Sequence, residues 1–245
     1  MNNNERYIRQ IILPEIGVEG QEKLASARVL VVGAGGLGCP AMQYLVSSGI
    51  GTIGIIDFDT VSVSNLHRQV LYSEEDIGSP KVDIAKRQLE KVNPNCNITT
   101  YHKILSSKNA AAIIGDYDIV IDATDMISSR YLINDTCLAM QKPFVYGAVY
   151  KYQGQVAVFN LDNGPTYRCL FPNPPVAKIE DCNGSGILPV LPGIIGLMQA
   201  TETIKIITGL GTPLSGVVGV FDIKTMQWER IELSKKQTIK KQLAS

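Results

Sequence analysis

The chain has 245 residues, of which 45% are hydrophobic and 19% are charged. This length and apolar content suit one α/β domain with a sizeable buried core. The 23 Lys and Arg residues equal the 23 Asp and Glu residues in number, so no net positive charge attracts nucleic acid or an anionic membrane. We therefore expect neither partner, and any anion-binding site must be local.

The chain carries no recognisable targeting or membrane-spanning signal. Residues 1–10 are polar and charged, and the most apolar stretch, residues 187–200, is short and contains Pro189, Pro192 and Gln199. A membrane span requires about 18 uncharged apolar residues. The five cysteines are scattered and form no close pair, which argues against a disulfide framework. We expect a cytoplasmic protein.

Runs of apolar, β-branched residues alternate with helical patterns through residues 28–150. This alternation predicts repeated βαβ units around a buried parallel sheet. One intervening helix has a start signal, with Ser79 as the expected N-cap and Pro80 at the first helical position. The predicted parallel strands are Arg28–Val32, Thr52–Phe58, Asn97–Tyr101, Asp118–Asp122 and Phe144–Ala148.

The pattern changes after Tyr150, where three segments alternate as antiparallel strands do. They are Gln155–Asn160, Val217–Ile223 and Trp228–Leu233. Between them, residues 161–189 are rich in proline with little periodicity, which is typical of a functional crossover loop. Leu191–Thr208 then predicts a mostly buried helix that ends at Gly209. We therefore predict a doubly wound, Rossmann-like α/β sheet, mostly parallel, with antiparallel C-terminal strands at one edge.

A glycine motif follows the first predicted strand. Gly33, Gly35, Gly36 and Gly38 lie in Gly-Ala-Gly-Gly-Leu-Gly at a strand-to-helix turn, where glycines let the backbone approach a phosphate and the helix N-terminus binds it. Asp57 at the end of the second strand is placed to accept hydrogen bonds from a ribose. These residues alone indicate an adenine nucleotide, and a NAD-dependent oxidoreductase remains open at this point.

Polar residues after the second strand favour a triphosphate over a dinucleotide. Arg68 and Lys81 can offset the charge of three phosphates, and the Asn65 amide can fix their orientation. After the fourth strand, Asp125 lies at the carboxyl edge of the sheet, where it could hold Mg²⁺. The alternative role of Asp125 is to cap the helix that begins near Ile127.

These motifs together resemble the ThiF, MoeB and HesA adenylyltransferases, relatives of ubiquitin-activating enzymes that activate sulfur-carrier proteins. The resemblance covers nearly the whole chain. It is carried by Arg6-Tyr-Ile-Arg9-Gln10, Gly33–Gly38, Asp57-Phe-Asp59, Ser64–Gln69, Pro80-Lys81, Thr124-Asp125, Tyr167-Arg-Cys169-Leu and the strand at Trp228.

The resemblance implies adenylation of the C-terminal carboxylate of a small sulfur-carrier protein ending in Gly-Gly, with ATP and Mg²⁺ as cofactors. It implies a homodimer in which Arg9 reaches the neighbouring subunit's site, and the apolar residues of segment 6–16 suit an interface. Cys182 takes the place of the family's active-site cysteine. The expected catalytic residues are Arg9, Arg68, Lys81, Asp125 and Cys182, and the expected nucleotide-binding residues are Gly33, Gly35, Gly36, Gly38, Asp57, Asp59, Ser64, Asn65, Arg68, Gln69, Lys81, Asp125 and Met126.

The sequence departs from this family at three places. Two Cys-x-x-Cys pairs hold a structural zinc in relatives, but here Thr166 replaces the first cysteine and the tail from 234 to 245 has no cysteine, so we expect Cys169 to be a buried packing residue. We therefore expect no zinc. Met126 replaces the usual Asn after Asp125. Two acidic residues precede Cys182, which leaves open whether this cysteine is a nucleophile or an inert loop residue.

The attacking carboxylate, with a pKa of about 3.5, is ionised at neutral pH, so the reaction requires no general base. A separate sulfurtransferase is a possible partner. A NAD-dependent oxidoreductase and a non-catalytic scaffold that binds the carrier are the alternatives. We predict one domain over residues 1–245, with a helical arm at 1–27, a nucleotide-binding half at 28–150, a crossover loop and carrier-binding half at 151–233, and a basic tail at 234–245.

Overall fold

The computed structural model describes residues 3–174 and 186–234. Their strands are β1 (Arg28–Val32), β2 (Thr52–Asp57), β3 (Asn97–His102), β4 (Ile119–Asp122), β5 (Phe144–Tyr150), β6 (Gln153–Phe159), β7 (Val217–Asp222) and β8 (Gln227–Glu232). The α-helices are α1 (Asn3–Arg6), α2 (Ile8–Ile11), α3 (Gly17–Ser26), α4 (Gly38–Ser48), α5 (Lys81–Val92), α6 (Ala110–Gly115), α7 (Ile127–Ala139), α8 (Tyr167–Leu170) and α9 (Val190–Thr208). Three short 3₁₀ turns, η1 (Val63–Asn65), η2 (Glu74–Asp76) and η3 (Leu161–Asn163), lie in the connections.

All eight strands form one sheet in the order β3-β2-β1-β4-β5-β6-β7-β8. The first five are parallel to one another, whereas β6, β7 and β8 each pair antiparallel with the strand before them. The predicted fold class is therefore confirmed. Because β1 lies between β2 and β4, the loops that follow these three strands meet at one edge of the sheet.

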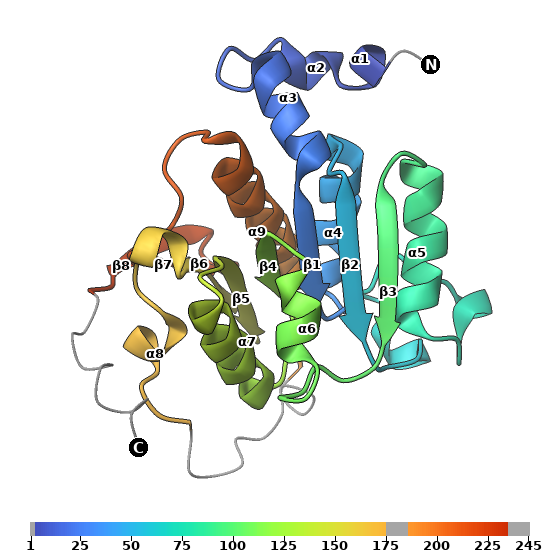
Figure 1. The fold of residues 1–245 in the computed structure, drawn as a ribbon. Coiled ribbons are helices and arrows are strands. Elements are labelled where there is room, and N and C mark those ends of the chain that lie inside the picture. The colour runs from blue at the N-terminus through green and yellow to red at the C-terminus, as the bar shows by residue number, and fades with distance from the viewer. Residues whose placement is uncertain (1–2, 175–185, 235–245) are drawn as a thin grey trace.

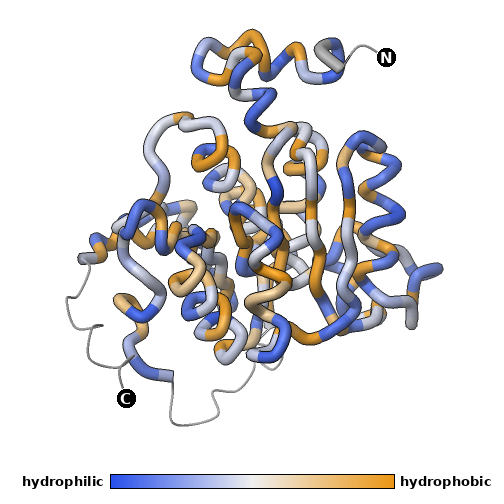
Figure 2. Tube along the Cα trace, in the orientation of Figure 1, coloured by the Kyte–Doolittle hydropathy of each residue, from blue (hydrophilic) through white to orange (hydrophobic). Residues whose placement is uncertain are grey.

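Helices cover both faces of the sheet (Figure 1). One core cluster joins the sheet to α4, α5 and α9, and the other joins it to α6 and α7. The central strands are apolar along their length, whereas the outward side of α5 is hydrophilic (Figure 2). Burial on both faces explains why the parallel strands are nearly continuous apolar runs rather than alternating ones.

The expected N-cap of α5 is wrong by one residue. Pro80 occupies the N-cap position with extended backbone angles, and no side chain caps the helix. Ser79 instead accepts a hydrogen bond from the Val61 amide through its carbonyl, and Pro80 forms an isolated bridge with Thr60. Proline restricts the residue before it to extended conformations, so this segment runs against residues 60–61 before the helix begins.

Helix α9 is long and apolar enough to cross a membrane by length and composition. In this fold it packs on the sheet, where Leu191 and Ile195 are fully buried and the Gln199 amide donates to the carbonyl oxygens of Asp122 and Val145. It ends at Gly209 in a left-handed conformation, as predicted. The helix is therefore part of the protein core.

Candidate functional site

The turn between β1 and α4 packs so tightly against neighbouring backbone that two of its positions require glycine. Gly33 has a φ of 102°, and a Cβ atom there would lie 2.6 Å from the carbonyl oxygen of Ala123. A Cβ atom on Gly38 would lie 2.1 Å from the carbonyl oxygen of Gly33. Gly35 and Gly36 face the cleft at this edge of the sheet. The turn thus exposes backbone to a ligand without intervening side chains.

Asp57, at the end of β2, holds this turn in place. One carboxylate oxygen accepts a hydrogen bond from the Ala34 amide at 2.7 Å, and the other accepts from the Asp59 amide at 2.8 Å. Burial raises the pKa of the Asp57 carboxyl, while these two amides and the charge of Lys81 oppose that rise. The carboxylate therefore connects the ends of β1 and β2.

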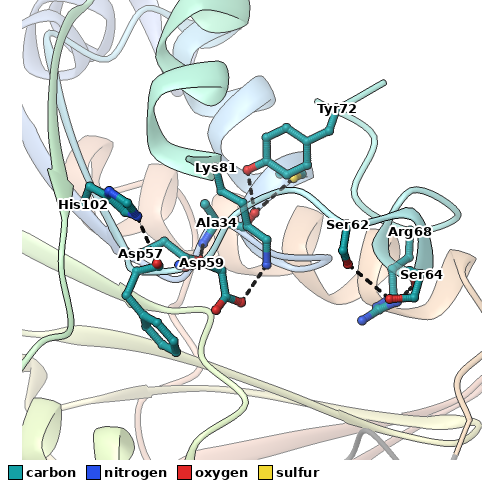
Figure 3. Close-up of polar contacts among 11 residues, drawn as sticks. Ala34, Asp57, Asp59, Ser62, Ser64, Arg68, Tyr72, Lys81 and His102 are labelled. Carbon is teal, nitrogen blue, oxygen red and sulfur yellow. Dashed lines mark hydrogen bonds and ion pairs between the residues drawn. The ribbon is translucent and has the colours of Figure 1, made fainter. Parts of the chain in front are cut away.

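Lys81 is a buried cation at the start of α5. Its side chain is only 4% exposed, and its ammonium lies 2.8 Å from a carboxylate oxygen of Asp59, which is 47% exposed (Figure 3). The Lys81 amide also donates to the Asp59 carbonyl. These contacts fix a positive charge on the floor of the cleft, next to Asp57.

Arg68 reaches the same cleft from the loop after β2. Its guanidinium donates to the Ser64 carbonyl at 3.0 Å and lies 3.4 Å from the exposed His67 ring. Gln69 is buried and also lines the cleft. Ser64 and Asn65 do not line the cleft. The Ser64 hydroxyl contacts the Ser62 hydroxyl (Figure 3). The Asn65 carbonyl accepts hydrogen bonds from the backbone amides of Arg68 and Gln69.

The loop after β4 carries two aspartates in different environments. Asp122 is fully buried and accepts hydrogen bonds from the Thr124 amide and hydroxyl. Burial raises the pKa of its carboxyl, and the charge of Arg130 only partly opposes that rise. Asp125 is exposed and faces the cleft. Met126 takes the N-cap position of α7 with no side-chain cap bond, so the alternative capping role of Asp125 is not seen.

These groups surround a cleft of about 330 Å³ at the carboxyl ends of the parallel strands. This volume is within the usual range of small-molecule sites. The structure brings together most of the expected nucleotide-binding residues here: Gly33, Gly35, Gly36, Asp57, Asp59, Arg68, Gln69, Lys81, Asp125 and Met126. Gly38 lies beneath the turn, in α4.

Several lining residues carried no signal in the sequence. Lys103 lies just after β3, Lys151 lies in the turn between β5 and β6, and Pro192 is on α9. Lys151 also pairs with Ile187, so the region just before α9 borders the cleft. No short motif marks these residues, because the sheet order brings them together.

Two expected catalytic residues are not placed in this cleft. Cys182 lies outside the described residues. Arg9 is exposed on the helical arm, which lies beyond the amino ends of the strands, at the end of the sheet opposite the cleft (Figure 1). Helix α5 spans this separation: it begins at Lys81 in the cleft and contacts the arm at its other end, through 12 residues or about 18 Å.

Residues 166–169, where relatives carry a zinc-binding cysteine pair, are held in place here by hydrogen bonds. Cys169 is buried, as predicted, and its sulfur lies 3.4 Å from the Thr166 amide. Arg168 forms two hydrogen bonds of 2.7 Å with the Asp135 carboxylate. Over residues 3–174 and 186–234, no group of three or more His, Cys, Asp and Glu residues could hold a metal. A Mg²⁺ ion bound by one carboxylate and phosphate oxygens does not require such a group.

Comparison with known proteins identifies the family of the chain. The ThiF family model matches residues 7–241. The chain is 49% identical over 240 residues to the adenylyltransferase and sulfurtransferase MOCS3 of Culex quinquefasciatus, covering 97% of this chain and 55% of that protein. It is 47% identical to a sulfur carrier protein adenylyltransferase of Thermus thermophilus, covering 89% of this chain and 83% of that protein. The chain spans little more than half the length of the MOCS3 relatives.

Solved structures share the fold. A crystal structure of Escherichia coli MccB with ATP superimposes with a TM-score of 0.84 at 22% identity, covering 96% of this chain and 74% of that one. At this identity the likeness supports the architecture alone. Because the ThiF family model matches residues 7–241, almost the whole of the chain, the chain belongs to the ThiF family.

Proposed function

We propose that this protein uses ATP and Mg²⁺ to adenylate the C-terminal glycine carboxylate of a small sulfur-carrier protein, with release of pyrophosphate. The observation that carries the proposal is the charge arrangement of the cleft. The buried cation of Lys81 and the guanidinium of Arg68 come from the segment after β2, the exposed carboxylate of Asp125 comes from the loop after β4, and the glycine turn follows β1, which lies between these two strands. This arrangement suits a triphosphate with a bound divalent cation.

The names of the relatives support the same activity. They include a sulfur carrier protein adenylyltransferase and a probable molybdopterin-synthase adenylyltransferase. The second of these, from Porphyra purpurea, is 46% identical over 236 residues. We accordingly propose that the product serves sulfur transfer in thiamine or molybdopterin type biosynthesis.

The reaction requires charge neutralisation and positioning more than proton transfer. An oxygen of the ionised carboxylate attacks the α-phosphorus of ATP, the bond from that phosphorus to the bridging oxygen breaks, and pyrophosphate leaves with the bond electrons. Two anions must meet, so Lys81 and Arg68 stabilise the charge that develops on the phosphates. Mg²⁺ bound through Asp125 would supply further positive charge. Asp122 is fully buried and bound to Thr124, which leaves Asp125 as the carboxylate available to a metal in this loop.

The active unit that we propose is a homodimer in the cytoplasm. Arg9 is too far from the cleft of its own chain to act there, because the length of α5 separates the arm from Lys81. The apolar side chains of Ile8, Ile12 and Leu13 are about half exposed on the same arm, which suits contact with a second copy. Arg9 would then complete the partner's site.

The later sulfur step is a separate proposal. Cys182 would accept the acyl group or pass sulfur after adenylation, and a separate sulfurtransferase would supply the sulfur. The MOCS3 relatives are named as both adenylyltransferases and sulfurtransferases, and the present chain matches little more than half of their length.

The test is ATP–pyrophosphate exchange with a Gly-Gly-ending carrier protein from the same genome. Exchange should depend on Mg²⁺ and on the free C-terminal carboxylate of the carrier. A carrier lacking its last two residues should support no exchange. Exchange at an equal rate with the truncated carrier would refute the proposal, and no exchange with any carrier would favour a binding scaffold.

A further inference from the structure

Helix α2 on the N-terminal arm has one exposed side and one anchored side. Arg9 and Ile8 are exposed, whereas Tyr7 is 7% exposed and Gln10 is partly buried. Tyr7 lies just before the helix and Gln10 three residues later, so both point to the same side. Tyr7 and Gln10, which flank the exposed pair Ile8 and Arg9 in sequence, therefore hold the arm against its own domain.

Tyr7 is bound to the far end of α5. The Asn93 amide donates to the Tyr7 hydroxyl at 2.8 Å and to the Val46 carbonyl at 2.9 Å. Asn93 is 1% exposed and caps the C-terminus of α5. The helix that places Lys81 in the cleft thus also fixes the arm at its other end.

Gln10 is bound to the end of α4. Its amide donates to the Gln21 side-chain oxygen at 2.8 Å and to the Ser48 carbonyl at 3.0 Å, and the Gln21 amide donates to the same carbonyl at 3.0 Å. Gly49 follows with a φ of 94°, and a Cβ atom there would lie 2.6 Å from the Gln21 amide nitrogen and 2.8 Å from the Tyr7 ring. We refer to Tyr7, Gln10, Gln21, Ser48 and Asn93 as the arm anchor.

The arm depends on this anchor because its first helices cannot be stable alone. Helices α1 and α2 have only four residues each, and isolated helices of this length do not persist in water. A mobile Arg9 would lose conformational freedom each time it reached a partner's nucleotide. The contacts of Tyr7 and Gln10 fix the backbone of the arm around Arg9 before a partner binds.

We propose that Tyr7 and Gln10 are positioning residues that orient Arg9 toward the nucleotide of a second copy of this chain. This inference rests on the proposed action of Arg9 across the dimer. It adds that the buried polar contacts of the arm serve catalysis in the partner and not only the stability of their own chain.

The test uses a variant that removes the anchor's hydrogen bonds and keeps its shape, Tyr7→Phe with Gln10→Met. Pyrophosphate exchange should fall by roughly 10²-fold, as misplaced catalytic groups commonly cause, with the KM for ATP within about two-fold of the wild-type value. Lys142→Met is the matched control, because it removes hydrogen bonds to the carbonyls of Gly115 and Tyr117, which neither belong to the arm anchor nor line the cleft. It should leave exchange unchanged.

Mixing experiments distinguish positioning from general destabilisation. Mixed with Lys81→Ala chains, the anchor variant should recover up to about a quarter of wild-type activity, since half of randomly paired dimers carry one complete site. Mixed with Arg9→Ala chains, it should recover nothing, because every arm is then defective. The single variant Tyr7→Phe should behave in the same way if the double variant does not fold.

The reference is the mixture of Arg9→Ala with Lys81→Ala. If it recovers activity and the anchor variant does not recover with Lys81→Ala, the positioning role is wrong and the action of Arg9 in trans stands. If the reference itself recovers nothing, both are wrong, while exchange by the wild type would still support the adenylation proposal. Wild-type exchange by the anchor variant would also overturn the inference.

Discussion

Replacing Lys81 by methionine should separate activity from stability. Lys81 is the buried cation of the cleft, and methionine has a similar length without charge. In the proposed reaction, the lost charge no longer stabilises the developing pyrophosphate. Removal of one such electrostatic donor typically costs about 10²- to 10³-fold in rate. We therefore expect Lys81→Met to lower exchange by at least about 10²-fold.

The free energy of unfolding should change little. Removing one partner of a fully buried ion pair costs about 3–5 kcal/mol, because the other charge is left without compensation. Asp59, the partner here, is 47% exposed, so water can solvate its carboxylate once the ammonium is gone. The change should thus stay below about 1 kcal/mol, as for exposed pairs. Burial of methionine in place of an ammonium could offset even that loss.

The assays are pyrophosphate exchange and urea unfolding of the same preparation. Lys86→Met is the matched control on the same helix, since Lys86 is 42% exposed and its ammonium lies 3.8 Å from Glu90. It should alter neither quantity. A Lys81→Met variant that exchanges normally, or that is destabilised by several kcal/mol with its rate per folded molecule preserved, would refute this role of the buried cation.

Four further predictions test other parts of the account. Asp125→Asn should lower exchange by about 10²-fold and raise the Mg²⁺ concentration for half-maximal rate, and an unchanged Mg²⁺ dependence would argue against metal binding there. Cys182→Ser should keep exchange and lose sulfur or acyl transfer, and loss of exchange in a folded variant would contradict this order. Elemental analysis should find no stoichiometric zinc, because Cys169 has no second cysteine near it in sequence, and one zinc per chain would refute this. Burial raises the pKa of the Asp135 carboxyl. The hydrogen bonds from Arg168 and Asn134 and the charge of Arg168 together lower this pKa by more than burial raises it, so the net shift is downward. This contribution to stability is present above the unfolded pKa of about 4 and is lost as the pH falls; Arg168→Met should therefore lower Tm at pH 7 more than at pH 3.

The strands were predictable because a buried parallel sheet imposes a local pattern. Each predicted strand agrees with the observed one to within about two residues at either end, the uncertainty usual for element boundaries. The glycines at 33 and 209 also carried a local signal, since both adopt positive φ. These features depend on neighbours within a few residues, so the sequence contains them directly.

The remainder depended on contacts between distant residues. Tyr7 was expected in a subunit interface with the other apolar residues of the arm, but it is buried against Asn93, 86 residues away. Lys103 and Lys151 border the cleft because β3 and β5 lie on either side of β2, β1 and β4. Nothing near them in sequence marks that position.

The measurement that tests the central claim most directly is mass spectrometry of the carrier protein after incubation with ATP, Mg²⁺ and this enzyme. We predict an adduct of one AMP on the C-terminal glycine carboxylate, formed together with pyrophosphate, and formed at least about 10²-fold more slowly with Lys81→Met. An unmodified carrier after ATP has been consumed, or AMP attached anywhere other than the C-terminal carboxylate, would contradict the account.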